Sequence, residues 1–171
     1  MNSTSKLPNL LVDQRFLPGH DRLFDELVQS VDWDGSMRAR KTASYGSSYD
    51  YSQMSYKVRE LHPALVPVAD RLETRLGFRP NNCLLNYYES GGNTMGYHSD
   101  ETANLADGTG LAIVSLGSAR EISFRNKEDL GNTVCITLEP GSLLYMGQDV
   151  QDEWMHAVQR QEGAGPRIIL T

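Results

Sequence analysis

The chain has 171 residues, of which 39% are hydrophobic, and its formal net charge at pH 7 is −6. This length supports one domain with a substantial core, and the hydrophobic share is typical of a globular protein. The acidic balance excludes a protein that coats nucleic acid by bulk electrostatics, because phosphates are neutralised by clustered Lys and Arg. No apolar run reaches the roughly 20 residues that span a bilayer, so no membrane partner is expected.

The N-terminal stretch MNSTSKLPNL lacks the basic and apolar blocks of a signal peptide. We therefore expect a cytoplasmic protein, or a nuclear one if the source is eukaryotic, and a monomer. The two cysteines, Cys83 and Cys135, lie in apolar, strand-like runs without CxxC spacing. That pattern predicts reduced thiols in the core, with no chemical role.

Two amphipathic helices are expected in the first half of the chain. Apolar residues recur at helical spacing over residues 19–31, and Asp21 lies near the start of this run. A second helix is expected over residues 63–76, since Pro63 suits a first turn and Gly77 suits the C-terminal end. Each helix should pack its apolar face on the rest of the protein.

From residue 81 onward the pattern changes to short runs rich in Val, Ile, Leu, Tyr and Thr, separated by Gly, Pro, Asn and Asp. Seven runs are predicted to be strands: CLLNYY, LAIVSLG, EISFRN, TVCITLEP, GSLLYMG, HAVQRQ and RIILT. Because no helical pattern intervenes, they favour a mainly β (α+β) domain, an antiparallel sandwich or barrel of the jelly-roll kind with N-terminal flanking helices. A single domain over residues 1–171 is expected.

The stretch GYHSDE places His98 and Asp100 two positions apart, where a strand is expected to resume at a sheet end. Residues two apart on a strand point the same way, so an imidazole and a carboxylate can meet while Ser99 faces elsewhere. Alone, such a pair is more often solvated surface. His156 opens a later strand that jelly-roll topology can bring beside His98. Two histidines and one carboxylate form the facial triad of non-haem Fe(II) oxygenases.

Arg167 follows on the last predicted strand. A guanidinium on a barrel strand can hold a dicarboxylate through two parallel hydrogen bonds, and 2-oxoglutarate is the dicarboxylate expected beside such a metal. By itself this arginine would be taken as an exposed strand residue. Its place after His98, Asp100 and His156, in that order, favours the co-substrate role.

Together these residues resemble the AlkB-type Fe(II)/2-oxoglutarate dioxygenases, especially their nucleic-acid demethylase branch, from about residue 37 to the end. LLNYYESGGNTMGYHSDE resembles the family's Asn-x-Tyr, glycine loop and His-x-Asp block, and GSLLYMGQDVQDEWMHAV resembles the segment that ends in the distal iron ligand. The resemblance implies a double-stranded β-helix, Fe(II), 2-oxoglutarate and O2. The implied iron ligands are His98, Asp100 and His156, and the implied 2-oxoglutarate contacts are Asn86, Tyr88, Arg167 and Thr171.

Upstream, RARKTASYGSSYDYS resembles the family's nucleotide-recognition segment, with Ala39 in place of its proline. Basic residues can hold phosphates, and tyrosines can stack on an unpaired base. Without the triad downstream, the segment would instead be taken as a tyrosine-rich strand and turn. We expect residues 37–80 to form this segment with its supporting helix, and 81–171 the jelly-roll core. The candidate substrate residues are Arg40, Lys41, Tyr45, Tyr49, Tyr51 and, after the His-x-Asp motif, Glu101.

The resemblance implies an enzyme that oxidatively demethylates N-alkylated bases in DNA or RNA, with release of formaldehyde, succinate and CO2. A base must leave the stack for such chemistry, and Tyr51 is the candidate that stacks on it. Two alternatives remain. An AlkB-like hydroxylase or demethylase of a protein or small molecule fits the triad equally well and the acidic balance better. A non-enzymatic jelly-roll module that holds a metal or a sugar is opposed by the ordered occurrence of the four candidate site residues.

Overall fold

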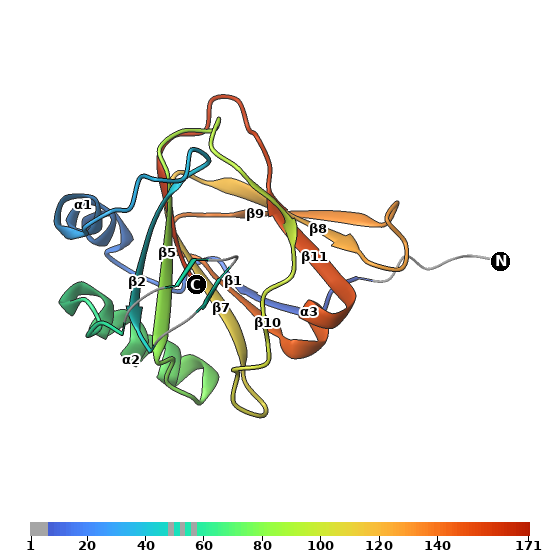
Figure 1. Ribbon diagram of the computed structural model, residues 1–171, viewed down its shortest axis with the longest axis horizontal. Helices are drawn as coiled ribbons and strands as arrows, with labels where there is room; N and C mark the ends of the chain where they lie inside the picture. Colours follow the sequence, from blue (N-terminus) through green and yellow to red (C-terminus); the bar gives the residue numbers. More distant parts are fainter. Residues whose placement is uncertain (1–6, 48–49, 52–53, 56–57) are drawn as a thin grey trace.

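The structure is a computed structural model, which describes residues 7–47, 50–51, 54–55 and 58–171. Its strands form two larger antiparallel sheets (Figure 1). The major sheet has the order β1 (Leu10–Asp13), β10 (Leu143–Gly147), β7 (Gly110–Gly117), β12 (Arg167–Leu170), β5 (Asn82–Tyr88) and β2 (Lys41–Gly46). The minor sheet has the order β6 (Met95–His98), β11 (Trp154–Val158), β8 (Arg120–Asn126) and β9 (Thr133–Leu138). A short ribbon pairs β3 (Asp50–Tyr51) with β4 (Met54–Ser55).

One hydrophobic cluster fills the space between the two sheets. It joins Ile169 and Met146 of the major sheet to Phe124, Ile122 and Trp154 of the minor sheet, each at most 4% exposed. We call the face of the major sheet that contacts this cluster its inner face. Two sheets joined by a shared core are the arrangement predicted as a jelly roll, so this prediction is confirmed.

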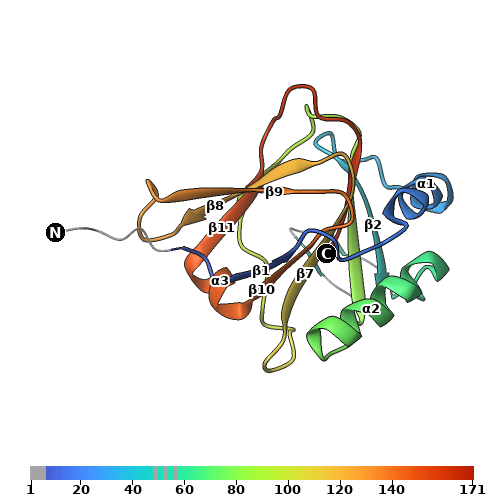
Figure 2. The ribbon, with the colours of Figure 1, turned by 180° about the vertical axis from the view of Figure 1, so that it is seen from behind.

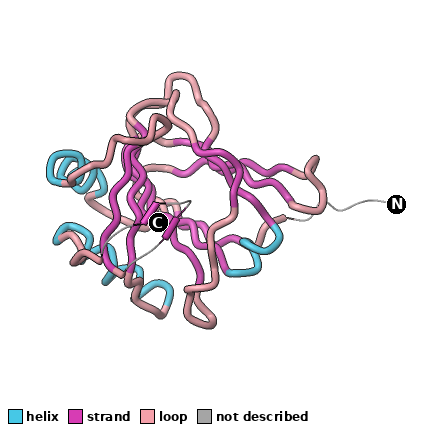
Figure 3. Tube along the Cα trace, in the orientation of Figure 1, coloured by secondary structure: helices cyan, strands magenta, loops and turns pink. Residues whose placement is uncertain are grey.

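Two helices cover the other, outer face of the major sheet. These are α1 (His20–Ser30) and α2 (Val66–Leu76), and α2 follows a 3₁₀ turn, η1 (Pro63–Leu65). Both lie beside β2 and β5 and away from β8 and β9 in the two opposite views (Figures 1 and 2). Buried side chains of the helices, Leu27 and Leu72 among them, join Leu85 and Ile168 of the sheet in a second cluster. Strands thus form the centre of the molecule, with helices outside them (Figure 3).

The alternation of side chains along each strand determines which residues reach which cluster. In β12, Ile168 and Leu170 belong to the outer cluster, while Arg167 and Ile169 point to the inner face, where they oppose Tyr88 and Asn86 of β5. All four residues of β12 are buried, because this strand lies between β5 and β7. A central strand therefore carries an arginine into the interior.

Several expectations about elements need correction. β1 and β2 were not among the predicted strands, a short helix α3 (Gln148–Glu153) precedes β11, and β11 begins at Trp154 rather than at His156. The prediction that Cys135 is a core thiol is wrong, since this side chain is exposed. In β9, Val134 and Ile136 take the less exposed positions on either side of it, so alternation turns the thiol outward. Within the described ranges, no helix is long and apolar enough to cross a membrane.

Candidate metal centre

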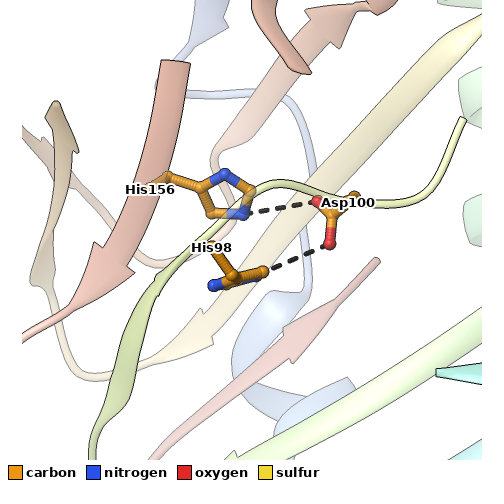
Figure 4. Close-up of side chains that lie close together, drawn as sticks. All are labelled: His98, Asp100 and His156. Atoms are coloured by element: carbon orange, nitrogen blue, oxygen red, sulfur yellow. Dashed lines mark ion pairs between the residues drawn. The ribbon is translucent and has the colours of Figure 1, made fainter. Parts of the chain in front are cut away.

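Three potential metal ligands meet where the minor sheet pairs β6 with β11. His98 and His156 are cross-strand partners, and their ring centroids lie 4.3 Å apart. Nε2 of His98 lies 3.5 Å from Oδ1 of Asp100, and Nε2 of His156 lies 3.3 Å from Oδ2 of the same carboxylate. Figure 4 shows both imidazoles directed toward that carboxylate. All candidate ligand atoms fall within 4.8 Å of one another, which is close enough for a single ion.

The hydrogen bonding of His98 suits metal binding. Its Nδ1 lies 2.8 Å from the carbonyl oxygen of Gly96, and a carbonyl can only accept, so Nδ1 carries the proton when the ring is neutral. Nε2, on the side of Asp100, is then left with its lone pair. A metal-binding histidine is commonly fixed in this way through its other ring nitrogen.

The electrostatics of Asp100 also favour a cation. Burial by itself would raise the pKa of this carboxyl, but interactions with His156 and His98 outweigh burial and hold the pKa well below its ordinary value. Its Oδ2 is buried and makes no hydrogen bond to any described residue. The 3.3 Å contact to His156 is thus close but not a well-formed hydrogen bond. A buried carboxylate beside two imidazoles is the donor set of a transition-metal site.

His98 and Asp100 do point to one place while Ser99 faces elsewhere, but strand alternation is not what orients Asp100. β6 ends at His98, so Asp100 lies beyond the strand and the argument from period two does not apply to it. Two hydrogen bonds from the other side of the centre hold the segment instead. Ser99 Oγ donates to the carbonyl oxygen of Trp154 at 2.8 Å, and the Asp100 amide donates to Oε1 of Gln151 at 2.8 Å. Gln151 was not singled out by sequence, where only its proximity to His156 could have indicated it.

Arg167 lies on the inner face of β12 with 0% of its surface exposed. Its Nε donates to the hydroxyl of Ser115 at 2.9 Å, while Nη1 and Nη2 have no hydrogen-bond partner among the described residues. Burial lowers the pKa of this guanidinium to about 10. A buried charge without a partner is costly, and two free N–H ends of a guanidinium match a carboxylate. The pattern is that of an anion site.

Tyr88 and Asn86 lie next to this guanidinium, on the paired strand β5. Burial raises the pKa of Tyr88, and the charges of Arg40, Arg167 and Arg120 act in the opposite sense. The Tyr88 hydroxyl donates to the sulfur of Met95 at 3.7 Å, a weak bond that a better acceptor can replace. Thr171, the fourth residue assigned to the co-substrate, is paired through its backbone with Leu84 and is half-buried.

A buried arginine that sequence did not single out supports the loop that leads into β6. Arg120 donates to the carbonyl oxygens of Ser90, Gly91, Asn93 and Gln159, at 2.5 to 3.2 Å. Its guanidinium carbon lies 5.3 Å from the ring centroid of Tyr88. In the sequence, Arg120 lies just before the predicted strand EISFRN, a position where an exposed arginine is equally common.

The predicted substrate residues that the structure describes, Arg40, Lys41, Tyr45 and Glu101, are not brought together. Arg40 is only 8% exposed, and its Nε donates to Oδ1 of Asn86 at 2.7 Å, so it lies in the interior rather than along the route of a nucleic-acid strand. Lys41 takes the opposite face of β2 and pairs with Glu89 at 2.8 Å. One basic side chain is thus buried and the other forms an ion pair at the surface, which differs from the expectation that both hold phosphates.

The prediction for Tyr45 also needs correction. This side chain is 5% exposed and belongs to the outer cluster, with its ring 5.6 Å from that of His62. Glu101 is exposed, and its carboxylate accepts the backbone N–H of Ala103. Tyr49 and the side chain of Tyr51 lie outside the described residues.

The fold and the donor set correspond to one class of protein. Residues 19–171 match the family model described as the 2OG-Fe(II) oxygenase superfamily. A solved structure, that of OsALKBH1, superposes with a TM-score of 0.70 over 96% of this chain and 97% of that chain, at 16% sequence identity. At such low identity the likeness concerns the fold alone.

Relatives with similar sequences indicate which branch of this superfamily the chain resembles. DNA oxidative demethylase ALKBH2 from Mus musculus is 31% identical over 88% of this chain and 73% of its own length. The Bos taurus protein of that name is 30% identical, and this chain spans 63% of its length. Alpha-ketoglutarate-dependent dioxygenase alkB homolog 3 from Bos taurus is 30% identical, with 60% of its length spanned. The chain therefore belongs to the AlkB-type family of 2OG-Fe(II) oxygenases.

Membership implies Fe(II), 2-oxoglutarate and O2, and the residues present fit these groups. The buried carboxylate oxygen of Asp100 and the two free N–H ends of Arg167 are the polar atoms that lack partners within the described part of the chain and that such groups would satisfy. His98, Asp100 and His156 offer nitrogen and oxygen ligands suited to iron. Arg167 and Tyr88 offer donors to a carboxylate.

Proposed function

We propose that this protein is an Fe(II)/2-oxoglutarate-dependent dioxygenase that oxidatively demethylates N-alkylated bases in DNA or RNA. The observation that carries the proposal is that the three-ligand cluster lies near the Arg167 guanidinium, whose Nη1 and Nη2 have no partner among the described residues. Tyr88 connects the two: it is the cross-strand partner of Arg167, and its hydroxyl donates to Met95 of β6, the strand that ends in His98. The relatives named DNA oxidative demethylase support a nucleic-acid substrate.

Three ligands on one side of an ion leave further coordination positions open. His98, Asp100 and His156 would hold the iron, and Arg167 would hold the far carboxylate of 2-oxoglutarate, with Ser115 fixing the guanidinium from behind. When bound, iron and 2-oxoglutarate supply the oxidation: one oxygen atom of O2 enters succinate as CO2 leaves, and the other hydroxylates the substrate's methyl group. The protein's residues bind and orient; none of them acts as a nucleophile.

The buried inner face also excludes water from the co-substrate. Arg167, Ser115 and Tyr88 are each 0% exposed. Charge interactions are stronger in such an environment than in water, which favours a preorganised guanidinium as the anchor. A hydroxymethyl group on the base nitrogen then breaks down: the C–N bond cleaves, formaldehyde leaves and the nitrogen recovers its proton. The base is restored with its glycosidic bond intact.

Product analysis on a panel of methylated oligonucleotides, both DNA and RNA and both single- and double-stranded, tests the proposal. With Fe(II) and 2-oxoglutarate present, a methylated substrate should give formaldehyde and an equal amount of succinate above the level that forms without substrate. Asp100→Ala should abolish both products, because two imidazoles alone hold the ion poorly. The matched control is Asp107→Ala, a carboxylate outside the cluster, which should retain activity.

The outcomes separate the parts of the proposal. Substrate-independent decay of 2-oxoglutarate without formaldehyde from any oligonucleotide would overturn the nucleic-acid part and favour a protein or small-molecule substrate. Full activity in Asp100→Ala would overturn the metal centre. Tyr51 remains a candidate for base stacking from sequence, and Tyr51→Ala should then weaken oligonucleotide turnover by about 1 to 3 kcal/mol while substrate-independent decay persists.

A further inference from the structure

We infer that Gln151 is a positioning residue for Asp100: its side-chain amide fixes the segment that presents this carboxylate and so sets the metal affinity of the centre. The inference rests on the metal centre of the proposed function and adds a residue to it. Gln151 lies in α3 and, among the described residues, makes no hydrogen bond to a candidate ligand atom; it accepts a hydrogen bond from the backbone amide of Asp100.

The need for such a residue follows from where β6 ends. His98 and His156 are held by the ladder between β6 and β11, whereas Asp100 is two residues past the last residue of β6. The carboxylate leaves the backbone through a short side chain, so its place depends on the backbone at Asp100. The hydrogen bond from the Asp100 amide to Oε1 of Gln151, at 2.8 Å, is the tie at that residue.

The surroundings of Gln151 indicate that packing alone does not explain it. The side chain is 3% exposed, and among the described residues its Nε2 donates to the sulfur of Met146 alone, at 3.4 Å, a weak acceptor. Burial of an amide with one of its groups poorly paired costs free energy, and an apolar side chain of equal volume would fill the space without that cost. The strong bond of this amide is the one to Asp100.

The same tie couples Asp100 to the distal histidine. Gln151 lies five residues before His156, and between them the carbonyl of Trp154 accepts the Ser99 hydroxyl. Lys127 Nζ donates to the carbonyl oxygen of Gln151 at 2.6 Å and fastens α3 to the end of β8. The segment from α3 into β11 therefore carries His156 and also holds the backbone of Asp100. This fixes the positions of the two ligands relative to each other.

Cobalt binding to the full chain without iron or 2-oxoglutarate tests the inference independently of catalysis. Co(II) is titrated while its visible absorption and the heat of binding are recorded. Gln151→Met removes the acceptor at similar volume and should raise the Kd for Co(II) tenfold or more, the size expected when a residue that orients a ligand is lost. Gln151→Glu keeps an oxygen that accepts the same N–H and should bind Co(II) at least as tightly as the wild type.

Gln148→Met is the matched control. This glutamine lies in the same helix, but its amide donates to the carbonyl oxygens of Ala106 and Thr109, away from the candidate ligands. Its loss should leave the Kd for Co(II) unchanged. The melting temperature of each metal-free variant, measured in parallel, separates lost folding from lost affinity of the folded protein.

Two results would overturn the inference. One is a wild-type Kd in Gln151→Met; the other is equal weakening in Gln151→Met and Gln151→Glu, since the acceptor oxygen would then not be the cause. Failure of the metal centre itself has a different signature. In that case the wild type takes up no Co(II), or Asp100→Ala takes it up as well as the wild type, and both the centre and this inference fall.

Discussion

The two faces of the major sheet carry opposite chemistry although the same strands build them. The outer face is apolar and covered by α1 and α2, with Leu85 and Ile168 in its cluster. On the inner face, Arg167, Asn86 and Ser115 lie among apolar residues, buried to a similar degree. Apolar burial stabilises the fold, whereas a buried, partly unpaired guanidinium opposes it. The comparison indicates that apolar packing on the outer face stabilises the sheet, and that this stability offsets the cost of burying a charged anion-binding group on the inner face.

Arg167→Met should give the largest effect and separates binding from stability most clearly. Loss of a charged partner from a buried carboxylate costs about 2 to 5 kcal/mol of binding, so the KM for 2-oxoglutarate should rise tenfold or more. The free energy of unfolding without ligand should stay the same or rise by about 1 kcal/mol, since a buried charge is replaced by an apolar chain. Steady-state kinetics and urea unfolding measure the two quantities. An unchanged KM would mean that another residue anchors the co-substrate.

Arg40 and Lys41 allow the two faces to be compared at adjacent positions. Arg40→Ala leaves Oδ1 of Asn86 without its partner in the interior and should cost about 1 to 3 kcal/mol of unfolding free energy. Lys41→Ala removes only the exposed pair with Glu89 and should leave the melting temperature unchanged. The melting temperatures of both variants, measured by thermal unfolding, test these two expectations. Equal losses in the two variants would contradict the assignment of these side chains to opposite faces.

Ile168 and Ile169 allow the outer and inner faces to be compared with identical side chains. Shortening either isoleucine to valine should cost about 0.5 to 1.5 kcal/mol of stability, because each is at most 4% exposed. Ile168→Val, on the outer face, should leave the KM for 2-oxoglutarate unchanged in the folded protein. Ile169→Val should raise it, because Ile169 is the cross-strand partner of Asn86 and Ser115. A raised KM in the outer-face variant alone would reverse the comparison.

Thiol labelling is expected to show the smallest effect. It compares a strand covered by helices, β5, with a strand whose thiol is exposed, β9. Burial raises the pKa of Cys83 to about 12, and this residue packs against the outer cluster, while Cys135 is exposed. Iodoacetamide at pH 8 should therefore label Cys135 and spare Cys83 until the protein unfolds. Above the ordinary thiol pKa of 9.0, the unfolded state loses this proton first, so rising pH should weaken the fold. Rapid labelling of both thiols in the native protein would contradict this placement.

Sequence predicted the elements that depend on short-range pattern and missed those that depend on distant partners. The jelly roll and the meeting of His98 with His156 follow from strand alternation and topology. The setting of Asp100 does not, since the residue that holds its amide is 51 positions away in the chain. The burial of Arg40 could not be predicted either, because its partner Asn86 comes opposite only when β2 pairs with β5. Cys135, by contrast, could have been placed outside from the alternation of its own strand.

The contacts of Arg120 bear on how the loop between β5 and β6 can change over evolutionary time. All four hydrogen bonds end on main-chain oxygens, three of them in this loop, so they do not depend on which side chains the loop carries. Gly91 is the exception, because a Cβ there would overlap the carbonyl oxygen of Gln161. We therefore expect the path of this loop to tolerate sequence drift elsewhere, with one arginine and one glycine as the fixed points through which β6 keeps its entry to the metal centre.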